Sequence, residues 1–169
     1  VGIVAGQTVS GLFLDRVGYG PAGVVAITPG RIMGAVLALI AVGISISADL
    51  LATVPIWMLV LPVLAGAGIA WQQATNGRLR HRVGTALTAT LVNFIGGTTV
   101  LAIAAGTHIA FVGPPKALPT EPWLYIGGAM GMTYILLSAS LVRFTGMLLL
   151  GLASIVGQLV ASVLIDIWW

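Results

Sequence analysis

The chain has 169 residues, of which 59% are hydrophobic and only 7% are charged, and its formal net charge is +3. Its mean hydropathy is +1.11, whereas soluble domains carry about 25% charged residues. This composition excludes an ordinary soluble domain and predicts an integral membrane protein. The chain contains no cysteine, so disulfide bonds and thiolate metal sites are excluded.

Six apolar segments follow one another along the chain. They cover residues 1–14, 32–48, 55–76, 86–105, 122–142 and 147–167. The first is too short to cross a bilayer by itself, whereas the others approach the length of about 20 residues that a spanning helix needs. We therefore expect an all-α, polytopic bundle of transmembrane helices. The continuous hydropathy does not fit a β-barrel, whose strands alternate polar and apolar residues over about 10 positions.

Proline, threonine and glycine residues mark several of the expected boundaries. Pro55 is expected to begin the third helix, because proline is favoured in the first turn. Pro62 lies inside the same segment and predicts a local kink. Thr85 is the expected N-cap of the fourth helix. A short turn over residues 143–146 should separate the fifth helix from the sixth.

Basic residues gather at one end of the expected bundle. If every segment crosses once, the connections after the first, third and fifth segments share one side of the membrane. That side carries six of the seven basic residues, Arg16, Arg31, Arg78, Arg80, Arg82 and Arg143, and the other side has Lys116. The positive-inside rule places the arginine-rich connections in the cytoplasm. Tryptophans at the opposite segment ends agree with this orientation, namely Trp57, Trp123, Trp168 and Trp169.

A glutamine and an aspartate recur with the same spacing near the two ends of the chain. Displacing the sequence by 151 residues places Gly6, Gln7, Val9 and Asp15 on Gly157, Gln158, Val160 and Asp166. The second copy lies five segments after the first, and because five is an odd number the two helices should point in opposite directions. This pattern predicts the inverted-topology repeat that is typical of secondary transporters.

Polar and small residues within the apolar segments are the candidate functional residues. An amide that faces lipid costs free energy, so it should face protein or water. Our candidates for a solute pathway are Gln7, Gln72, Gln73, Asn76, Asn93, Tyr134, Ser138 and Gln158. Small residues allow helices to approach closely in lipid, and the candidates for that role are Gly6, Gly68, Gly97, Gly127, Gly131 and Gly157. The alternative is that both sets only pack helices together.

The charged residues exclude several kinds of chemistry. None lies near the centre of a segment, so no carboxylate is expected to exchange a proton for a cationic solute. Asp15 and Asp166 are expected to be helix caps or packing partners. Arg78, Arg80, Arg82 and Arg143 are expected to be topology anchors that contact anionic lipid, not nucleic acid. The two histidines are too isolated for a metal site, and no catalytic constellation or cofactor motif is present, so we expect neither an enzyme nor a cofactor.

The motifs resemble those of a known family. The sequence Trp71-Gln72-Gln73-Ala74-Thr75-Asn76-Gly77-Arg78-Leu79-Arg80-His81-Arg82-Val83-Gly84 resembles the end of the first helix in the YdcZ-like branch of the drug/metabolite transporter superfamily. The resemblance extends to Val92-Asn93-Phe94 with Gly96-Gly97, to Pro122-Trp123 followed by Ile126-Gly127-Gly128, and to the Gly-Gln helix that ends on Asp166.

This resemblance implies an exporter of the bacterial inner membrane, built from units of about five helices. Residues 1–50 would be the last helices of a first unit, and residues 55–169 the first four helices of a second. We therefore expect a carrier of small metabolites or drug-like solutes that works by alternating access. The alternative is an accessory membrane subunit whose polar stripes dock partner helices. Expected partners are membrane lipids, a small-molecule solute, and a second copy or other membrane subunits.

Overall fold

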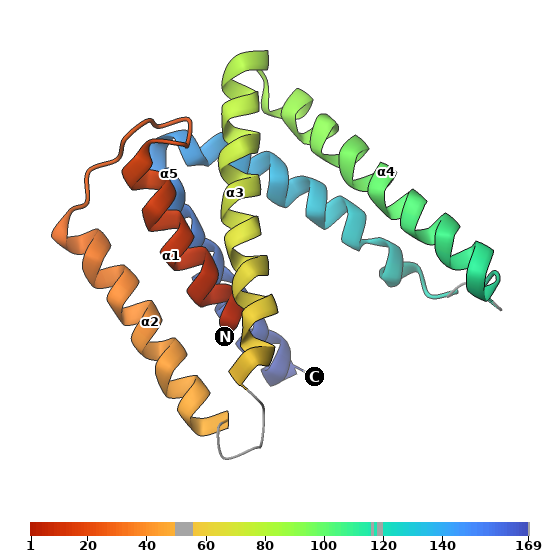
Figure 1. Cartoon of the computed structure of the whole chain (residues 1–169), viewed down its shortest axis with the longest axis horizontal. Coiled ribbons are helices and arrows are strands. Elements are labelled where there is room, and N and C mark those ends of the chain that lie inside the picture. The colour runs from red at the N-terminus through yellow and green to blue at the C-terminus, as the bar shows by residue number, and fades with distance from the viewer. Residues whose placement is uncertain (50–55, 116, 118–119, 169) are drawn as a thin grey trace.

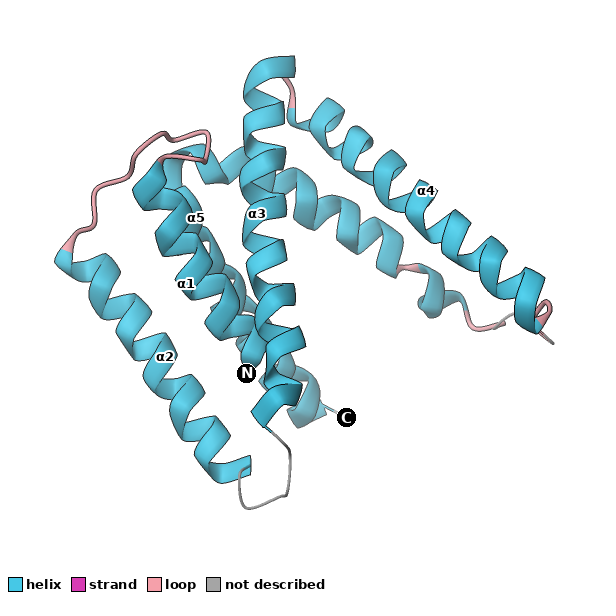
Figure 2. Ribbon diagram, in the orientation of Figure 1, coloured by secondary structure: helices cyan, strands magenta, loops and turns pink. Residues whose placement is uncertain are grey.

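The computed structural model describes residues 1–49, 56–115, 117 and 120–168, and within these every regular element is helical (Figures 1 and 2). The α-helices are α1 (Gly2–Val17), α2 (Pro29–Asp49), α3 (Val60–Val83), α4 (Ala86–Val112) and α5 (Gly127–Trp168). Two short 3-10 helices, η1 (Ile56–Leu59) and η2 (Pro122–Tyr125), precede α3 and α5. The predicted all-helical class is confirmed.

Helix α5 is two helices joined at one residue. Gly146 has φ 72° and ψ 179° and interrupts the helical backbone, so the predicted four-residue turn is reduced to a single position. We call residues 127–145 the first arm and residues 147–168 the second arm. The two arms run in different directions from this break (Figure 1). The predicted six apolar segments therefore correspond to six helical rods.

The core of the fold forms where α1, α3 and the second arm meet. Helices α1 and α3 approach so closely that a Cβ atom at Gly6 would collide with the Val63 carbonyl, and one at Gly66 with the Ile3 carbonyl. Such an approach requires glycine on both helices. The buried apolar cluster beside it consists of Leu14, Ala70, Ala74, Val142, Met147 and Leu150. We call α1, α3 and the second arm the core group.

Helix α1 and the second arm run antiparallel. Asp15, near the end of α1, binds the backbone at the start of the second arm. One turn earlier Gly11 lies against Leu148, and Gln7 contacts Gly151. The two stretches that share the Gln/Asp spacing therefore have opposite directions in space. The five-helix organisation of residues 1–50 and 55–169 as parts of two inverted units stays a prediction.

Helices α4 and the first arm lie together away from α1 and α2 (Figure 1). We call this pair the peripheral hairpin. Its large apolar side chains are mostly exposed, as are those of α2, which is the expected distribution for surfaces that face lipid. Within the described residues, three stretches are long and apolar enough to cross a membrane, namely Pro29–Ser47, Ala86–Val112 and Pro122–Trp168. The last of these contains both arms of α5.

Several predicted boundaries were wrong. Helix α3 continues to Val83, so the basic run after Asn76 is helical rather than a loop. Basic residues in a last turn are favourable beside the helix dipole, and hydropathy alone does not detect this extension. Pro62 lies near the junction of η1 and α3, where the first turn has unpaired N–H groups anyway, so it is not an interior proline. The predicted start at Pro55 lies outside the described residues.

The predicted cap of α4 is confirmed, although the helix is longer than expected. The Thr85 hydroxyl accepts the Thr88 backbone N–H at 3.1 Å. The helix passes Ala105 and ends at Val112, before Gly113. Thr99 and Thr107 donate their hydroxyls to carbonyls of their own helix, so these polar residues lie on an apolar helix without an unpaired hydrogen.

Candidate functional site

A cluster of amides joins α3 to α4. The Asn93 side-chain oxygen accepts hydrogen bonds from Gln72 Nε2 at 3.0 Å and from Asn76 Nδ2 at 3.1 Å. Gln72 and Asn76 lie one helical turn apart on α3, which brings both to the same partner. Asn76 is buried, whereas Gln72 is exposed. The cluster thus begins inside the fold and reaches its surface.

A second polar chain joins α3 to both arms of α5. Gln73 Nε2 donates to the Tyr134 hydroxyl at 2.6 Å, and this hydroxyl lies 3.5 Å from the Ser154 hydroxyl. Ser154 donates in turn to the Leu150 carbonyl of its own helix. The Gln73 side chain is almost completely buried, yet its oxygen has no hydrogen-bond partner. Five of the predicted pathway residues therefore meet in two neighbouring sets on one stretch of α3.

Two other pathway candidates lie along a groove between the arms of α5. The groove has a cavity volume of ≈ 440 Å³ and is lined by Tyr134, Leu137, Ser138, Leu141, Leu150, Ala153, Ser154, Gly157, Gln158 and Ala161. Ser138 is buried and donates to the Ile135 carbonyl, whereas Gln158 is exposed. The walls are mainly apolar with hydroxyl and amide groups placed along them. A groove of this chemistry suits an amphipathic ligand.

Gln7 lies apart from these sets, inside the core group. It is 4% exposed, its Nε2 has no hydrogen-bond partner, and its side chain packs on Gly151. The neighbouring Thr8 hydroxyl is also buried without a partner. Unpaired buried polar groups are costly, so Gln7 and Thr8 are positions where water or a polar solute group would be stabilised.

The glycines predicted to pack helices have different surroundings. Gly6 lies in the tight α1–α3 contact, and a Cβ atom at Gly131 would be 3.6 Å from the Phe94 ring. A Cβ atom would meet nothing within 4 Å at Gly68, Gly97, Gly127 and Gly157. A Cβ atom added at any of these four positions would therefore meet no other helix within the described chain. Gly66, which makes the contact reciprocal to that of Gly6, was not among the predicted packing glycines.

Asp15 fixes the bend between the arms, as the predicted role of helix cap requires. Its carboxylate accepts the backbone N–H groups of Met147 at 2.6 Å and Leu148 at 3.0 Å. It also pairs with Arg31 at 2.9 Å, and Arg31 donates to the Thr145 carbonyl at 2.6 Å. Gly146 is required here because a Cβ atom would lie 2.9 Å from both Asp15 oxygens. Asp166, the counterpart in the sequence, is exposed.

The arginines at the basic end of the fold differ in their surroundings. Arg31 is bound to Asp15, and the Arg78 guanidinium lies 4.6 Å from the centre of the Tyr19 ring. Hydrogen bonding to Thr75 and Trp71, together with the nearby Arg78 charge, lowers the pKa of Tyr19. Arg80 and Arg143 line a small cavity that also includes His81, and Arg82 is exposed. The basic end could be predicted from the sequence, but the role of Arg31 could not, because its partner Asp15 lies on another helix.

The described residues contain no group of three or more histidine or acidic side chains that could hold a metal ion. The polar sets consist of amides and hydroxyls, which donate and accept hydrogen bonds without changing charge. Such groups can bind a polar but uncharged part of a solute. Ser154 was missed because a single serine between apolar residues gives no pattern in the sequence.

Comparison with known proteins agrees with the membrane fold. Residues 57–169 match the sequence model of the family described as "Putative inner membrane exporter, YdcZ". No curated protein and no solved structure matches the chain. The family match covers more than half of the chain and includes α3, α4 and both arms of α5. This protein therefore belongs to the YdcZ family of proteins described as inner membrane exporters.

Proposed function

We propose that the protein exports a small amphipathic solute by alternating access, using the polar sets on α3 and the groove between the arms of α5. The observation that carries the proposal is the convergence of Gln73, Tyr134 and Ser154 from three helical rods. The hydrogen bonds between these side chains can be replaced by hydrogen bonds to a solute when the rods separate. The apolar groove beside Tyr134 would hold the hydrophobic part of that solute.

The connections of the peripheral hairpin suggest how it would move. Gly84 lies between α3 and α4 with φ 82°, and Gly146 lies between the arms with φ 72°. Gly84 and Arg143, which is close to Gly146 in the chain, line the same small cavity, so both connections lie at the basic end. A rotation about these two residues, with release of the Arg31–Thr145 hydrogen bond that holds the first arm, would open or close the polar sets while the core group stays fixed. Hinges of this kind are commonly a few element-terminal residues.

The part of the solute that contacts the polar sets is expected to be polar but uncharged. All members of the two polar sets are neutral amides and hydroxyls. The only ion pair in the described residues, Arg31–Asp15, is occupied in holding the bend. This arrangement favours a solute recognised by hydrogen bonds and apolar surface, with any coupling ion bound elsewhere.

The experiment is a comparison of cells that express the protein with cells that carry an empty vector. Both are grown in the presence of small, amphipathic, toxic compounds. For any compound that the expressing cells tolerate better, transport by the purified protein is then measured in proteoliposomes. Gln73→Leu and Tyr134→Phe should lower this flux, whereas Leu101→Ala on the exposed face of α4 should not. Equal flux in all three variants would remove the polar sets from the pathway.

A second function is favoured by one observation. Gly97 and Gly127 lie on the peripheral hairpin with nothing within 4 Å of a Cβ position, so a close-packing surface is uncovered. An accessory subunit would use that surface to dock partner helices. Purification in a stoichiometric complex, without any flux in proteoliposomes, would decide for this role. A chain that purifies without partner subunits and confers flux in proteoliposomes would decide against it.

A further inference from the structure

The basic end contains a small cavity that neither the polar sets nor the groove explains. It has a volume of ≈ 220 Å³ and is lined by Pro21, Gly77, Arg80, His81, Gly84 and Arg143. These residues come from three segments: the α1–α2 connection, the end of α3, and the first arm just before the bend. The volume is below the range of about 300–1,000 Å³ that is typical of drug-sized ligands, so the cavity suits a small group.

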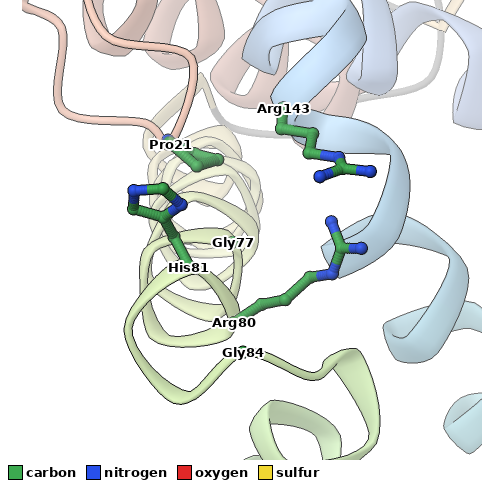
Figure 3. A pocket seen from close by; sticks show the side chains of 6 residues that line it. All are labelled: Pro21, Gly77, Arg80, His81, Gly84 and Arg143. Atoms are coloured by element: carbon green, nitrogen blue, oxygen red, sulfur yellow. The ribbon is translucent and has the colours of Figure 1, made fainter.

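Two guanidinium groups converge in this cavity. Figure 3 shows the Arg80 side chain from α3 and the Arg143 side chain from α5 extending toward one another, with His81 beside Pro21 on the other side. In the described chain no carboxylate forms an ion pair with either arginine, because the one ion pair joins Arg31 to Asp15. Like charges that face one another repel, and an anion between them would remove that repulsion.

Arg80 is held in place yet incompletely paired. Its Nη1 donates to the Ser140 carbonyl at 3.3 Å, whereas its Nε is buried without a hydrogen-bond partner. Arg143 rests on the Phe144 ring, 4.2 Å from its centre, which leaves the edge of the guanidinium available. Guanidinium groups bind phosphate oxygens in a planar, two-pronged geometry. An unpaired buried N–H of this kind is the group that a phosphate oxygen would satisfy.

Glycines keep the cavity open and fix its walls. At Gly77 a Cβ atom would collide with Val142, and it would lie 2.8 Å from Pro21 Cγ. The absence of a side chain at Gly77 therefore lets Pro21 and the first arm approach α3. Gly84 has φ 82° and ends α3 through a hydrogen bond from its N–H to the Arg80 carbonyl at 2.9 Å.

From these observations we propose that the cavity is a phosphate site, in which Arg80 and Arg143 bind one phosphate group between α3 and α5. The phosphate belongs either to the head group of an anionic lipid or to a soluble phosphate. Basic pockets between membrane helices are suited to phosphate head groups. A bound phosphate would join the core group to the peripheral hairpin beside Gly84, one of the two connections of that hairpin.

The test uses the full chain purified in detergent. Native mass spectrometry measures retention of phosphatidylglycerol and cardiolipin against phosphatidylcholine, and thermal unfolding measures stabilisation by inorganic phosphate. Arg80→Gln and Arg143→Gln should each weaken binding by about tenfold or more, because each removes charge-assisted hydrogen bonds. Arg16→Gln is the matched control, since Arg16 is exposed and does not line the cavity.

The two sources of phosphate give different results. Selective retention of the anionic lipids, without stabilisation by inorganic phosphate, identifies a lipid head group. Stabilisation by inorganic phosphate, lost in both cavity variants, identifies a soluble ligand. The proposal is overturned if the unaltered protein binds neither ligand, or if Arg16→Gln weakens binding as much as the cavity variants do. Arg143 is exposed, so its variant should fold and keeps the test valid if Arg80→Gln does not. None of these outcomes depends on solute export.

Discussion

Removing the Asp15 carboxylate should destabilise the protein through the bend between the two arms. Asp15 is 3% exposed and receives hydrogen bonds from Met147, Leu148 and Arg31 at 2.6, 3.0 and 2.9 Å. Asp15→Ala would leave the two backbone N–H groups and the arginine without their shared acceptor. Arg31 itself is mostly buried, with 12% of its side chain exposed, so water would replace the carboxylate poorly.

The size of the effect follows from the number and kind of these bonds. A hydrogen bond to a charged group contributes about 1.5–3 kcal/mol, and loss of one partner from a buried ion pair costs about 3–5 kcal/mol. The three bonds share one carboxylate, so their contributions do not add in full. We expect Asp15→Ala to lower the free energy of unfolding by about 3–5 kcal/mol. Asp15→Asn should cost less, because its amide oxygen still accepts a hydrogen bond.

The assay is equilibrium unfolding in mixed micelles, followed by the fluorescence of the five tryptophans. Asp166→Ala is the control, because Asp166 is exposed and surface changes usually stay within about 0.5 kcal/mol. Arg31→Gln combined with Asp15→Ala should cost at least about 1 kcal/mol less than the sum of the single changes. Equal losses for Asp15→Ala and Asp166→Ala, or a strictly additive double variant, would refute the proposed clamp.

Three further predictions test the core and the polar sets. Gly6→Leu should destabilise the fold by about 3 kcal/mol or prevent folding, because α1 and α3 touch there; Gly68→Leu, with open space around it, should have little effect in the same unfolding assay. Gly146→Ala should lower the free energy of unfolding by at least about 1–2 kcal/mol because of the positive φ, and by more because the new Cβ atom meets Asp15. Gly23→Ala is the control, because Gly23 has a similar φ and no neighbour within 4 Å of a Cβ atom, so it should cost less. Comparable losses of stability in the two variants would contradict this. Tyr134→Phe should cost about 1 kcal/mol by leaving the buried Gln73 amide unpaired, and an unchanged unfolding curve would show that the hydrogen bond contributes nothing.

The helices, and the placement of amides away from lipid, could be predicted because both follow from local chemistry. A long, continuously apolar segment in lipid must satisfy its own backbone hydrogen bonds and therefore forms a helix. An amide inside such a segment needs a hydrogen-bond partner. This rule predicts that Gln73 and Asn93 face protein or water, but it does not identify the partners that the structure gives them. Thr85 could be identified as a cap because its side chain and its target are three residues apart.

Contacts between distant segments could not be predicted in the same way. A row of small residues shows which face of a helix could approach another helix closely, but it does not show whether a neighbour lies against that face. A Cβ atom at Gly127, one of the glycines predicted to pack helices, would have no neighbour within 4 Å, whereas Gly66 lies in one of the tightest contacts of the fold. The pairing of Asp15 with Arg31 joins the end of one helix to the start of the next through a proline-containing connection. That pairing depends on the path of the connection, which hydropathy does not encode.

Water access to the groove between the arms is the most direct test of the transport proposal. The chain has no cysteine, so Ser154→Cys places a single thiol beside Tyr134, and Leu101→Cys places one on the exposed apolar face of α4 as a control. A thiol reacts as its thiolate, which forms only where water reaches it. The proposal predicts that a cationic, membrane-impermeant methanethiosulfonate labels Ser154→Cys when applied from either side of the membrane and leaves Leu101→Cys unlabelled. A Ser154→Cys variant that reacts from neither side would contradict it.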